Sequence, residues 1–330
     1  MKILIAGAGS IGTILGAYLS KHHDVSLLRK ISSSKTSSIK IIGIDDFTFD
    51  PKIYTKTNIQ NQNFDLIFIT TQAQQTDDLC SDLINSSLNM SNSIIINLQN
   101  GLNTYQKIQN YFPNNKLITG TVWWSATQIN LKKTLYHRKD KTFLGIPPNS
   151  FANKQDLENI FKILSKNFEV IISNNIVKEI RTKLILNVVS PPLALTKQPY
   201  PGGLNDINIK NIVHALFDEA IEISQLIGWD LDLETNSQLN NFHKSLTNTN
   251  TFDTSNHEYV HKVSTQISME KYGGQGSNID ELLSWMQNHG SLIADEIILL
   301  TKQQNKKYAP IDSTIFKQIL NSNSYAICQF

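Results

Sequence analysis

The feature that most constrains this chain is a glycine-rich run that directly follows an apolar segment at its start. Residues 2–6 read as a buried strand, and residues 7–12 spell GAGSIG, which fits the pattern G-x-G-x-x-G. Small and apolar residues then recur at helical spacing through residue 19. A strand, a glycine turn and a helix in this order form the context that a dinucleotide-binding loop requires.

The three glycines have separate predicted roles. Gly7 permits a tight turn, Gly9 lets the backbone approach a pyrophosphate, and Gly12 lets the helix pack closely on its strand. The helix N-terminus offers N–H groups and a positive dipole end to the phosphates. Glycine turns also join strands to helices in proteins that bind no nucleotide, but the full context favours binding. We therefore predict that the whole loop contacts the cofactor: Gly7, Ala8, Gly9, Ser10, Ile11 and Gly12.

The end of the second predicted strand, residues 25–28, indicates which cofactor binds. A free ribose 2′-hydroxyl usually meets an Asp or Glu at this point, whereas a 2′-phosphate needs a cation. Arg29 and Lys30 follow the strand and no acid does. The guanidinium of Arg29 presents a planar fork of donors that suits phosphate. A solvated charge at a strand end is the alternative, and the pattern favours NADPH over NADH.

Composition excludes several classes of protein. The formal net charge of +2 gives no strong field for nucleic acid or an acidic membrane, and no stretch approaches the ~20 apolar residues of a membrane span. Cys80 and Cys328 show neither metal spacing nor a disulfide framework. The glycines of the first loop interrupt any signal-peptide pattern. We expect a cytoplasmic protein with no nucleic-acid or membrane partner.

The order of elements predicts two domains. Strand signals fill the first half of the chain, and helical periodicity replaces them near residue 174. Strands are predicted at residues 39–44, 47–49, 64–71, 93–98, within 117–146 and at 169–173, with a helix at 156–166. Helices are predicted at residues 175–190, 208–227, 256–271 and 278–305. We predict a doubly wound α/β sheet of the Rossmann type over residues 1–174 and an all-helical domain over 175–330.

Polar side chains at two predicted strand ends are candidate ligand contacts. Gln72 lies at the carboxyl end of strand 64–71, where open α/β sheets bind ligands. Asn100 follows strand 93–98 and can both donate and accept hydrogen bonds toward a cofactor or a substrate. Asn100 and Gly101 also form a favoured turn dipeptide, which is the alternative reading.

A lysine and an asparagine in the helical half could act on a carbonyl group. Lys183 and Asn187 are four residues apart, which places both side chains on one helix face. The ammonium could protonate a developing alkoxide while the amide orients the substrate. On spacing alone, a solvated helix face explains the pair equally well.

The sequence also contains the zinc-protease pattern H-E-x-x-H at His257, Glu258 and His261, with Glu281 downstream as a further ligand. On a helix this pattern can hold zinc, with the glutamate as general base of a hydrolase. Because the pattern is short and lies inside a dinucleotide-binding chain, a solvent-facing or interface helix is favoured. The other histidines show no ligand spacing, and we predict no metal site.

Along nearly its whole length the chain resembles the ketopantoate reductase (2-dehydropantoate 2-reductase) family. The matching segments are GAGSIG at 7–12, Arg29, QNGL at 99–102, Ala126 after Gly120 and Thr121, RTKLILNVV at 181–189, and Ser268 with Met269. The resemblance implies cofactor contacts by Arg29, Asn100 and Ala126. It implies that Lys183 is the catalytic lysine, that Asn100, Asn187 and Ser268 bind substrate, and that Glu219 is an acid near the lysine.

Three departures from the family pattern are visible. Gln72 stands where the family has a lysine, and Pro191 replaces a second asparagine. The family segment T-E-I-D, whose glutamate holds the substrate hydroxyl, reads S-N-I-D at 277–280. The motif therefore places Asn278 at the glutamate, whereas counting from Met269 places Asp280 there.

The resemblance implies an NADPH-dependent oxidoreductase that reduces 2-dehydropantoate to pantoate, in pantothenate and coenzyme A biosynthesis. It implies substrate in the cleft between the domains, a helical domain like the C-terminal domain of 6-phosphogluconate dehydrogenase, and a homodimer. Two alternatives stay open: a related reductase of another 2-oxo acid, and a cofactor-binding regulator without catalysis.

Overall fold

The computed structural model describes residues 1–30, 38–235, 237–248, 279–303 and 310–323. The chain forms two compact units, Met1–Ile180 and Arg181–Phe330, and each is described by itself. The division lies inside helix α5 (Ile176–Leu186), whereas the predicted boundary at residue 174 precedes this helix. The start of α5 packs on the first unit, since a Cβ built at Gly145 would lie 2.6 Å from Cβ of Ile176.

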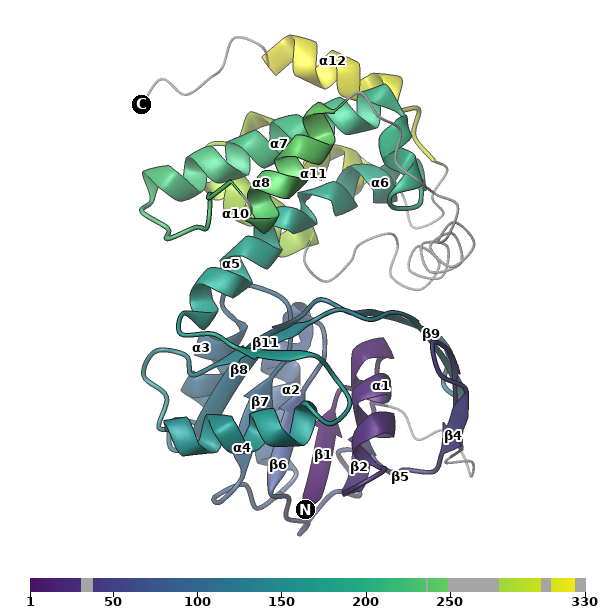
Figure 1. Cartoon of the computed structure of the whole chain (residues 1–330), viewed down its shortest axis with the longest axis vertical. Helices are drawn as coiled ribbons and strands as arrows, with labels where there is room; N and C mark the ends of the chain where they lie inside the picture. Colours follow the sequence, from purple (N-terminus) through teal and green to yellow (C-terminus); the bar gives the residue numbers. More distant parts are fainter. Residues whose placement is uncertain (31–37, 236, 249–278, 304–309, 324–330) are drawn as a thin grey trace. The chain divides into compact units, whose positions relative to one another are not determined.

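An eight-stranded sheet forms the centre of the first unit (Figure 1). Its order is β12-β11-β8-β7-β6-β1-β2-β5, and all neighbouring pairs are parallel except β8 with β11. The strands are β1 (Lys2–Ala6), β2 (Asp24–Leu28), β5 (Lys52–Tyr54), β6 (Leu66–Ile69), β7 (Ile94–Asn97), β8 (Lys116–Val122), β11 (Thr142–Gly145) and β12 (Val170–Ile172).

The central strands are buried along their length, as apolar runs in a parallel sheet predict. From β1 the chain continues to β2 on one side, whereas β6 and β7 lie on the other side. Strand order therefore reverses between β1 and β6, which is the point where sheets of this type bind ligands at their carboxyl ends. The predicted doubly wound α/β sheet is confirmed.

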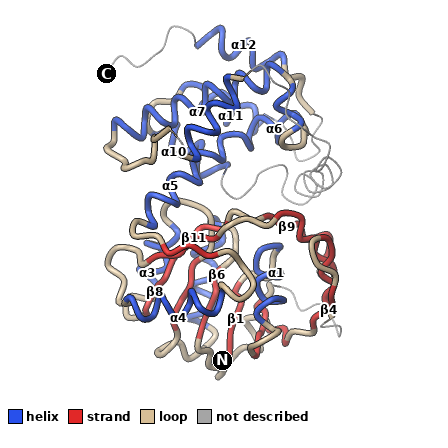
Figure 2. Tube along the Cα trace, viewed as in Figure 1, coloured by secondary structure: helices blue, strands red, loops and turns tan. Residues whose placement is uncertain are grey.

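A second sheet of four strands, ordered β4-β3-β10-β9, packs on helix α1 (Ser10–Leu19) from the side opposite the main sheet (Figure 2). Its strands are β3 (Ile39–Gly43), β4 (Phe47–Phe49), β9 (Ser125–Asn130) and β10 (Lys133–Arg138). Tyr18 of α1 joins this layer: its hydroxyl donates to Asp45, and its ring meets Phe47 and Tyr136 edge to face. Helix α1 is therefore buried between two sheets.

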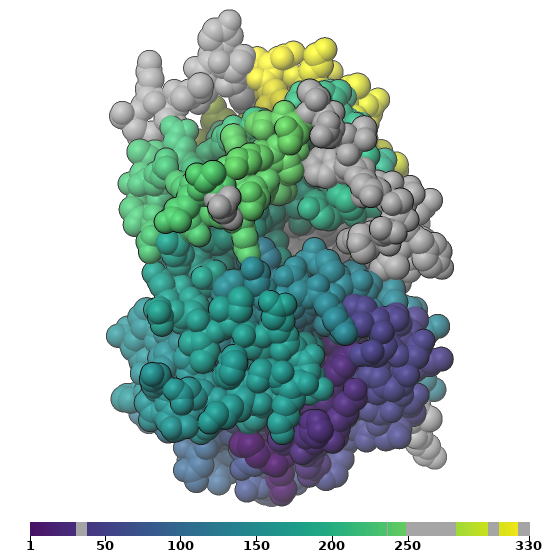
Figure 3. All heavy atoms as spheres, viewed as in Figure 1, coloured from purple at the N-terminus to yellow at the C-terminus, as the bar shows by residue number. Residues whose placement is uncertain are grey.

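The other helices of the first unit are η1 (Ala73–Gln75), α2 (Thr76–Asn85), α3 (Thr104–Tyr111) and α4 (Lys154–Leu164). Helices α2 and α3 pack together, and α4 packs on β11 and β12. Asn153 and Asp156 form a reciprocal capping box at the start of α4. Figure 3 shows α4 (teal) covering one face of this unit.

The second unit is built around helix α7 (Ile207–Leu226), which contacts α6, α8, α10, α11 and α12. Its buried side chains recur every three or four residues: Ile209, Ile212, Val213, Leu216, Phe217, Ala220 and Ile223. Asp206 caps α7 by accepting from the backbone of Asn208 and Ile209. The remaining elements are η2 (Asn187–Val189), α6 (Ser190–Thr196), η3 (Gly202–Asn205), α8 (Gln238–Thr247), α10 (Ile279–Asn288), α11 (Leu292–Gln303) and α12 (Thr314–Asn323).

No strand occurs among the described residues of this second unit, so the predicted all-helical architecture is confirmed there. The prediction of one helix over 278–305 is wrong, because α10 and α11 are separate helices. Gly290 lies between them with φ of 86°, a left-handed conformation that ends a helix. The predicted helix at 256–271 falls outside the described residues. Within the described ranges, none of the helices combines the length and apolar character needed to cross a membrane.

Candidate cofactor and catalytic sites

The glycine loop lies at the carboxyl end of β1, where the strand order reverses. Gly7 has φ of 112°, and a Cβ built there would lie 2.6 Å from the backbone nitrogen of Thr71. A Cβ built at Gly12 would lie 2.2 Å from the carbonyl oxygen of Gly7. Both positions therefore exclude any side chain, which is the steric role that the sequence predicted for the first and third glycines.

Gly9 differs from the other two glycines of the loop. Its φ of −80° and ψ of −161° are open to any residue, and among the described residues no atom outside its two chain neighbours lies within 4 Å of a Cβ built there. The protein's own packing therefore does not require glycine at this position. The space lies beside the first turn of α1, where backbone N–H groups have no intrahelical acceptor. This arrangement fits the pyrophosphate of a dinucleotide.

Two side chains hold the loop in place by donating hydrogen bonds to its carbonyl oxygens. Thr70 donates through Oγ1 to the carbonyl of Gly7 at 2.7 Å, and Gln128 donates through Nε2 to the carbonyl of Ala8 at 2.8 Å. Gln128 is buried on β9 and lies two residues after Ala126, so both side chains point to the same side of that strand. The sequence analysis identified Ala126 but missed Gln128, because nothing local links Gln128 to a loop 120 residues away.

A buried amide network positions the carboxyl end of β7. Asn97 donates through Nδ2 to Thr104 Oγ1 at 3.0 Å and to Thr119 Oγ1 at 3.1 Å. Gln99 donates through Nε2 to Thr71 Oγ1 at 2.9 Å, which ties the ends of β7 and β6 together. Since both amides are buried and hydrogen-bonded, they fix the backbone from which the next residues project.

The structure brings the predicted ligand contacts Gln72 and Asn100 to neighbouring strand ends. Gln72 opens η1, and its carbonyl accepts from Gln99 Nε2 at 3.3 Å. Asn100 follows Gln99, is half-buried, and precedes Gly101, whose φ is 114°. Strands β6 and β7 are parallel neighbours, so both side chains start from the same edge of the sheet. Their contact with a cofactor stays a prediction.

Arg29 lies directly after β2, as predicted, but its side chain is only 8% exposed. Its Nη2 donates to the carbonyl of Leu131 at 3.1 Å, in the turn between β9 and β10. Burial lowers the pKa of this guanidinium, which stays protonated because an arginine starts from a very high value. Lys30 is exposed and pairs with Asp78 at 3.7 Å. The end of β2 therefore carries cationic groups, and a phosphate contact by Arg29 stays a prediction.

Lys183 and Asn187 lie one turn apart at the start of the second unit. Lys183 is in the last turn of α5, and Asn187 is the first residue of η2. Because Leu186 has helical dihedrals, η2 continues directly from α5. Both side chains are half-buried. The 3₁₀ geometry follows from Pro191, which has no N–H to donate to the carbonyl of Asn187. The predicted pair therefore shares one face, and its chemical role stays a prediction.

An aromatic stack anchors the segment that carries this pair. The guanidinium of Arg181 lies 4.7 Å from the ring centroid of Trp229, and Trp229 stacks on Trp285 at 4.7 Å between centroids. An arginine over an indole face gains cation–π attraction. Thr182 and Leu184, on either side of Lys183, are buried. The backbone of Lys183 is therefore held by packing rather than by the lysine itself.

Glu219 is half-buried on α7, and the hydroxyl of Ser291 donates to its carboxylate. Ser291 also caps α11, since its Oγ accepts from the backbone of Ala294 at 3.0 Å. Burial raises the pKa of Glu219, the Ser291 hydrogen bond opposes this, and the nearby carboxylates of Glu222 and Asp295 raise it further. The sequence predicted an acid near the lysine, and the contact that the structure shows joins this acid to α11.

Several predicted site residues cannot be placed. Ser268, Asn278 and the histidines of the H-E-x-x-H pattern, His257 and His261, lie outside the described residues. Asp280 lies in α10, but its side chain is not described.

One group of potential ligands was missed. His214, Asp218 and His243 lie close together in the second unit. The statement that the other histidines show no ligand spacing is wrong for His214 and Asp218, which are four residues apart on α7. The pattern H-x-x-x-D was therefore visible, whereas His243 comes from another helix and only the fold brings it near.

Comparison with known proteins supports the predicted resemblance. Residues 3–149 match the family described as ketopantoate reductase PanE/ApbA. A 2-dehydropantoate 2-reductase from Pyrococcus abyssi is 27% identical over 198 residues, which cover 58% of this chain and 63% of that protein. The chain thus matches somewhat less than two thirds of that relative's length.

Solved structures share the fold along nearly the whole chain. D-mandelate dehydrogenase in a ternary structure with NADH and anilino(oxo)acetate gives a TM-score of 0.75 at 16% identity, covering 96% of this chain and 99% of that one. A PanE/ApbA family ketopantoate reductase from Ralstonia eutropha JMP134 gives 0.71 at 16% identity, covering 93% and 100%. At such low identity these likenesses establish the fold alone.

Proposed function

We propose that this chain, whose residues 3–149 match the ketopantoate reductase family, is an NADPH-dependent reductase of 2-oxo acids, with 2-dehydropantoate as substrate. The observation that carries the proposal is the glycine loop at the reversal of strand order. Gly7 and Gly12 are sterically required there, whereas Gly9 faces open space beside the first turn of α1. Such a loop holds a pyrophosphate through backbone N–H groups.

The end of β2 supports NADPH over NADH. A guanidinium is the preferred partner of a 2′-phosphate, and Arg29 with its neighbour Lys30 supplies positive charge where an NAD-dependent protein has an acid. The carbonyl of Leu131, in the turn between β9 and β10, accepts a hydrogen bond from Arg29 and holds its guanidinium in a defined place. We assign Gly7 to Gly12, Gln72, Asn100 and Ala126 to the remaining cofactor contacts.

A bound reduced nicotinamide supplies a hydride to the keto carbon of the substrate. The protein's part is to position the 2-oxo acid and to supply a proton. The ammonium of Lys183 donates that proton to the developing alkoxide, which general acid catalysis requires at neutral pH. The amides of Asn100 and Asn187 orient the substrate, the hydroxyl of Ser268 binds its carboxylate, and Asn278 or Asp280 holds its hydroxyl. We assign Glu219 as an acid near Lys183 and a further substrate-binding residue.

A second candidate is the reduction of an aromatic 2-oxo acid. Among the structures compared above, the D-mandelate dehydrogenase shares the fold over 96% of this chain, with NADH and anilino(oxo)acetate named as its ligands. Gln72 and Pro191 also depart from the ketopantoate reductase pattern. Under this second candidate, the chain accepts a phenyl group in place of the branched aliphatic group of 2-dehydropantoate.

A substrate panel tests the proposal. The purified chain is assayed with 2-dehydropantoate, phenylglyoxylate and pyruvate, each with NADPH and with NADH, by loss of nicotinamide absorbance. We expect the highest kcat/KM for 2-dehydropantoate with NADPH. A higher value for phenylglyoxylate selects the second candidate. NADPH binding by fluorescence with no turnover on any acid overturns both and indicates a cofactor-binding regulator.

A further inference from the structure

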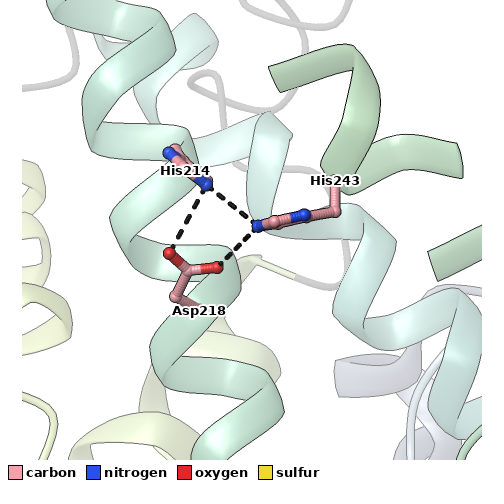
Figure 4. A group of neighbouring side chains, drawn as sticks. All are labelled: His214, Asp218 and His243. Atoms are coloured by element: carbon pink, nitrogen blue, oxygen red, sulfur yellow. Dashed lines mark hydrogen bonds and ion pairs between the residues drawn. The ribbon is translucent and has the colours of Figure 1, made fainter. Parts of the chain in front are cut away.

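The outer side of α7 carries three potential metal ligands (Figure 4). His214 and Asp218 project from α7 one turn apart, and His243 reaches toward them from α8. The two histidine Nε2 atoms are 3.1 Å apart. Oδ2 of Asp218 lies 3.5 Å from Nε2 of His214, and Oδ1 lies 3.5 Å from Nε2 of His243. All three side chains therefore direct a ligand atom at one point.

Two of these separations, 3.5 Å each, fall in the range expected for the edges of a tetrahedral zinc site, and the third, 3.1 Å between the two histidines, is slightly shorter. Zinc binds imidazole nitrogen and carboxylate oxygen at about 2.0–2.2 Å, which places neighbouring ligand atoms of a tetrahedron about 3.3–3.6 Å apart. We propose that His214, Asp218 and His243 bind one divalent transition-metal ion of the zinc type, through the two Nε2 atoms and the carboxylate. Two imidazoles and one carboxylate, with the fourth position open, are a ligand set that zinc adopts in proteins.

Hydrogen bonds alone do not make all three contacts among His214, Asp218 and His243 favourable. If one histidine Nε2 donates to the other, the accepting nitrogen carries no hydrogen. That nitrogen then presents only its lone pair to the carboxylate of Asp218, 3.5 Å away, and both groups are acceptors. A cation at the centre of the triangle converts all three contacts into favourable ones, because each atom then donates a lone pair to it.

The surroundings give an ion access and leave room for a further ligand. The side chains of His214, His243 and Asp218 are 32%, 42% and 55% exposed, and α8 (green) lies on the surface of its unit in Figure 3. The ring of His243 stacks on Phe217 at 5.9 Å, which limits its rotation. A cavity of about 320 Å³ borders the cluster and is lined by Asp218 and His243 together with Glu222 and Leu239. Water or a small anion in this cavity can complete the coordination.

An ion bound here would join α7 to α8. Because the three ligands meet only in the folded unit, binding stabilises the folded chain by mass action. This site is independent of the proposed reductase activity, and its test does not use that activity.

The test is a titration of the full chain, freed of metal by a chelator, with zinc chloride in a calorimeter. Three variants each remove one ligand: His214→Gln, Asp218→Asn and His243→Gln. We expect each to weaken zinc binding by at least about 100-fold, since even residues that only support a ligand cost 10–100-fold. Zinc should raise the Tm of the wild-type chain and leave the Tm of these variants unchanged.

Two matched controls and one competing site complete the experiment. His289→Gln removes an exposed histidine elsewhere in the same unit, and Glu222→Gln removes a carboxylate of the cavity that is not in the cluster. Both should bind zinc like the wild type. The double variant His257→Gln and His261→Gln tests the H-E-x-x-H pattern and should also retain this ion. Absence of zinc binding in the wild type overturns the proposal, as does binding lost only in the double variant.

Discussion

The two units of this protein encode their proposed sites in different ways. In the first unit the site is made of backbone: Gly7 and Gly12 are required by contacts under 3 Å, and buried side chains such as Gln128 hold the loop. In the second unit the site is made of half-buried side chains on helix faces, with Lys183 and Asn187 as the clearest pair. A site built from backbone leaves a motif in the sequence, whereas a site built from helical side chains leaves only a spacing.

The largest expected effect tests the side-chain site. Lys183→Ala should lower kcat/KM for the oxo acid by at least about 1,000-fold, because it removes the general acid. The dissociation constant for NADPH should stay near the wild-type value, since the lysine is not in the glycine loop. Steady-state kinetics and fluorescence titration measure the two quantities. Lys178→Ala, on the same helix, is the control. Near-normal turnover of Lys183→Ala would contradict the assignment of Lys183 as the general acid.

The next effect tests the backbone site through two of its glycines. Gly12→Ala should destabilise the chain by more than about 3 kcal/mol, because the new methyl group meets the carbonyl oxygen of Gly7, which cannot move aside cheaply. Gly9→Ala should unfold at the wild-type Tm, since its methyl group enters open space, yet bind NADPH at least about 10-fold more weakly. Thermal unfolding and NADPH titration separate the two outcomes. Unchanged NADPH affinity in Gly9→Ala contradicts the placement of the pyrophosphate.

A third substitution asks whether a side chain adds specificity to the backbone site. Arg29→Ala should weaken NADPH binding by about 10–100-fold, the value of one charged hydrogen-bond partner, and leave NADH binding nearly unchanged. The KM values for NADPH and for NADH are measured in the variant and in the wild type. Lys30→Ala, an exposed neighbour in an ion pair with Asp78, should have the smaller effect. Equal losses for both cofactors would mean that Arg29 acts only through its bond to Leu131.

The smallest expected effect concerns Glu219, the half-buried acid of the helical unit. Burial raises the pKa of Glu219 above its usual value of 4.5, so the folded state holds the proton more tightly than the unfolded state. The stability from this group is therefore present below about pH 4.5 and lost as pH rises through the folded pKa. Glu219→Gln should remove that loss of stability. The free energy of unfolding at neutral pH should rise by less than about 1 kcal/mol, because the group is partly solvated.

Thermal unfolding at mildly acidic and at neutral pH measures this change. Glu296→Gln, which removes an exposed carboxylate from α11, is the control and should leave the pH dependence of Tm unchanged. A pH dependence that is the same in Glu219→Gln and in the wild type would show that Glu219 does not carry it.

The sequence predicted structure correctly where the pattern that determines an element spans only a few neighbouring residues. The buried strands β1, β6 and β7 are apolar runs, and helix α1, which follows the glycine loop, is mostly apolar and buried from Gly12 to Leu19. The error at residues 278–305 had a local signal as well, since His289, Gly290 and Ser291 supply a helix end and a new N-cap. Apolar periodicity on both sides hid that break. The H-x-x-x-D spacing of His214 and Asp218 was equally visible and was passed over.

By itself the sequence determined the glycine loop, the doubly wound sheet, the change to helices and the spacing of Lys183 and Asn187. These follow from torsion angles, hydrophobic period and helix geometry, which act over a few residues. Only the tertiary structure decided that Gln128 holds the loop, that Arg29 bonds to Leu131, that Ser291 meets Glu219, and that His243 joins His214 and Asp218. Such contacts join residues far apart in the chain, so no local pattern carries them.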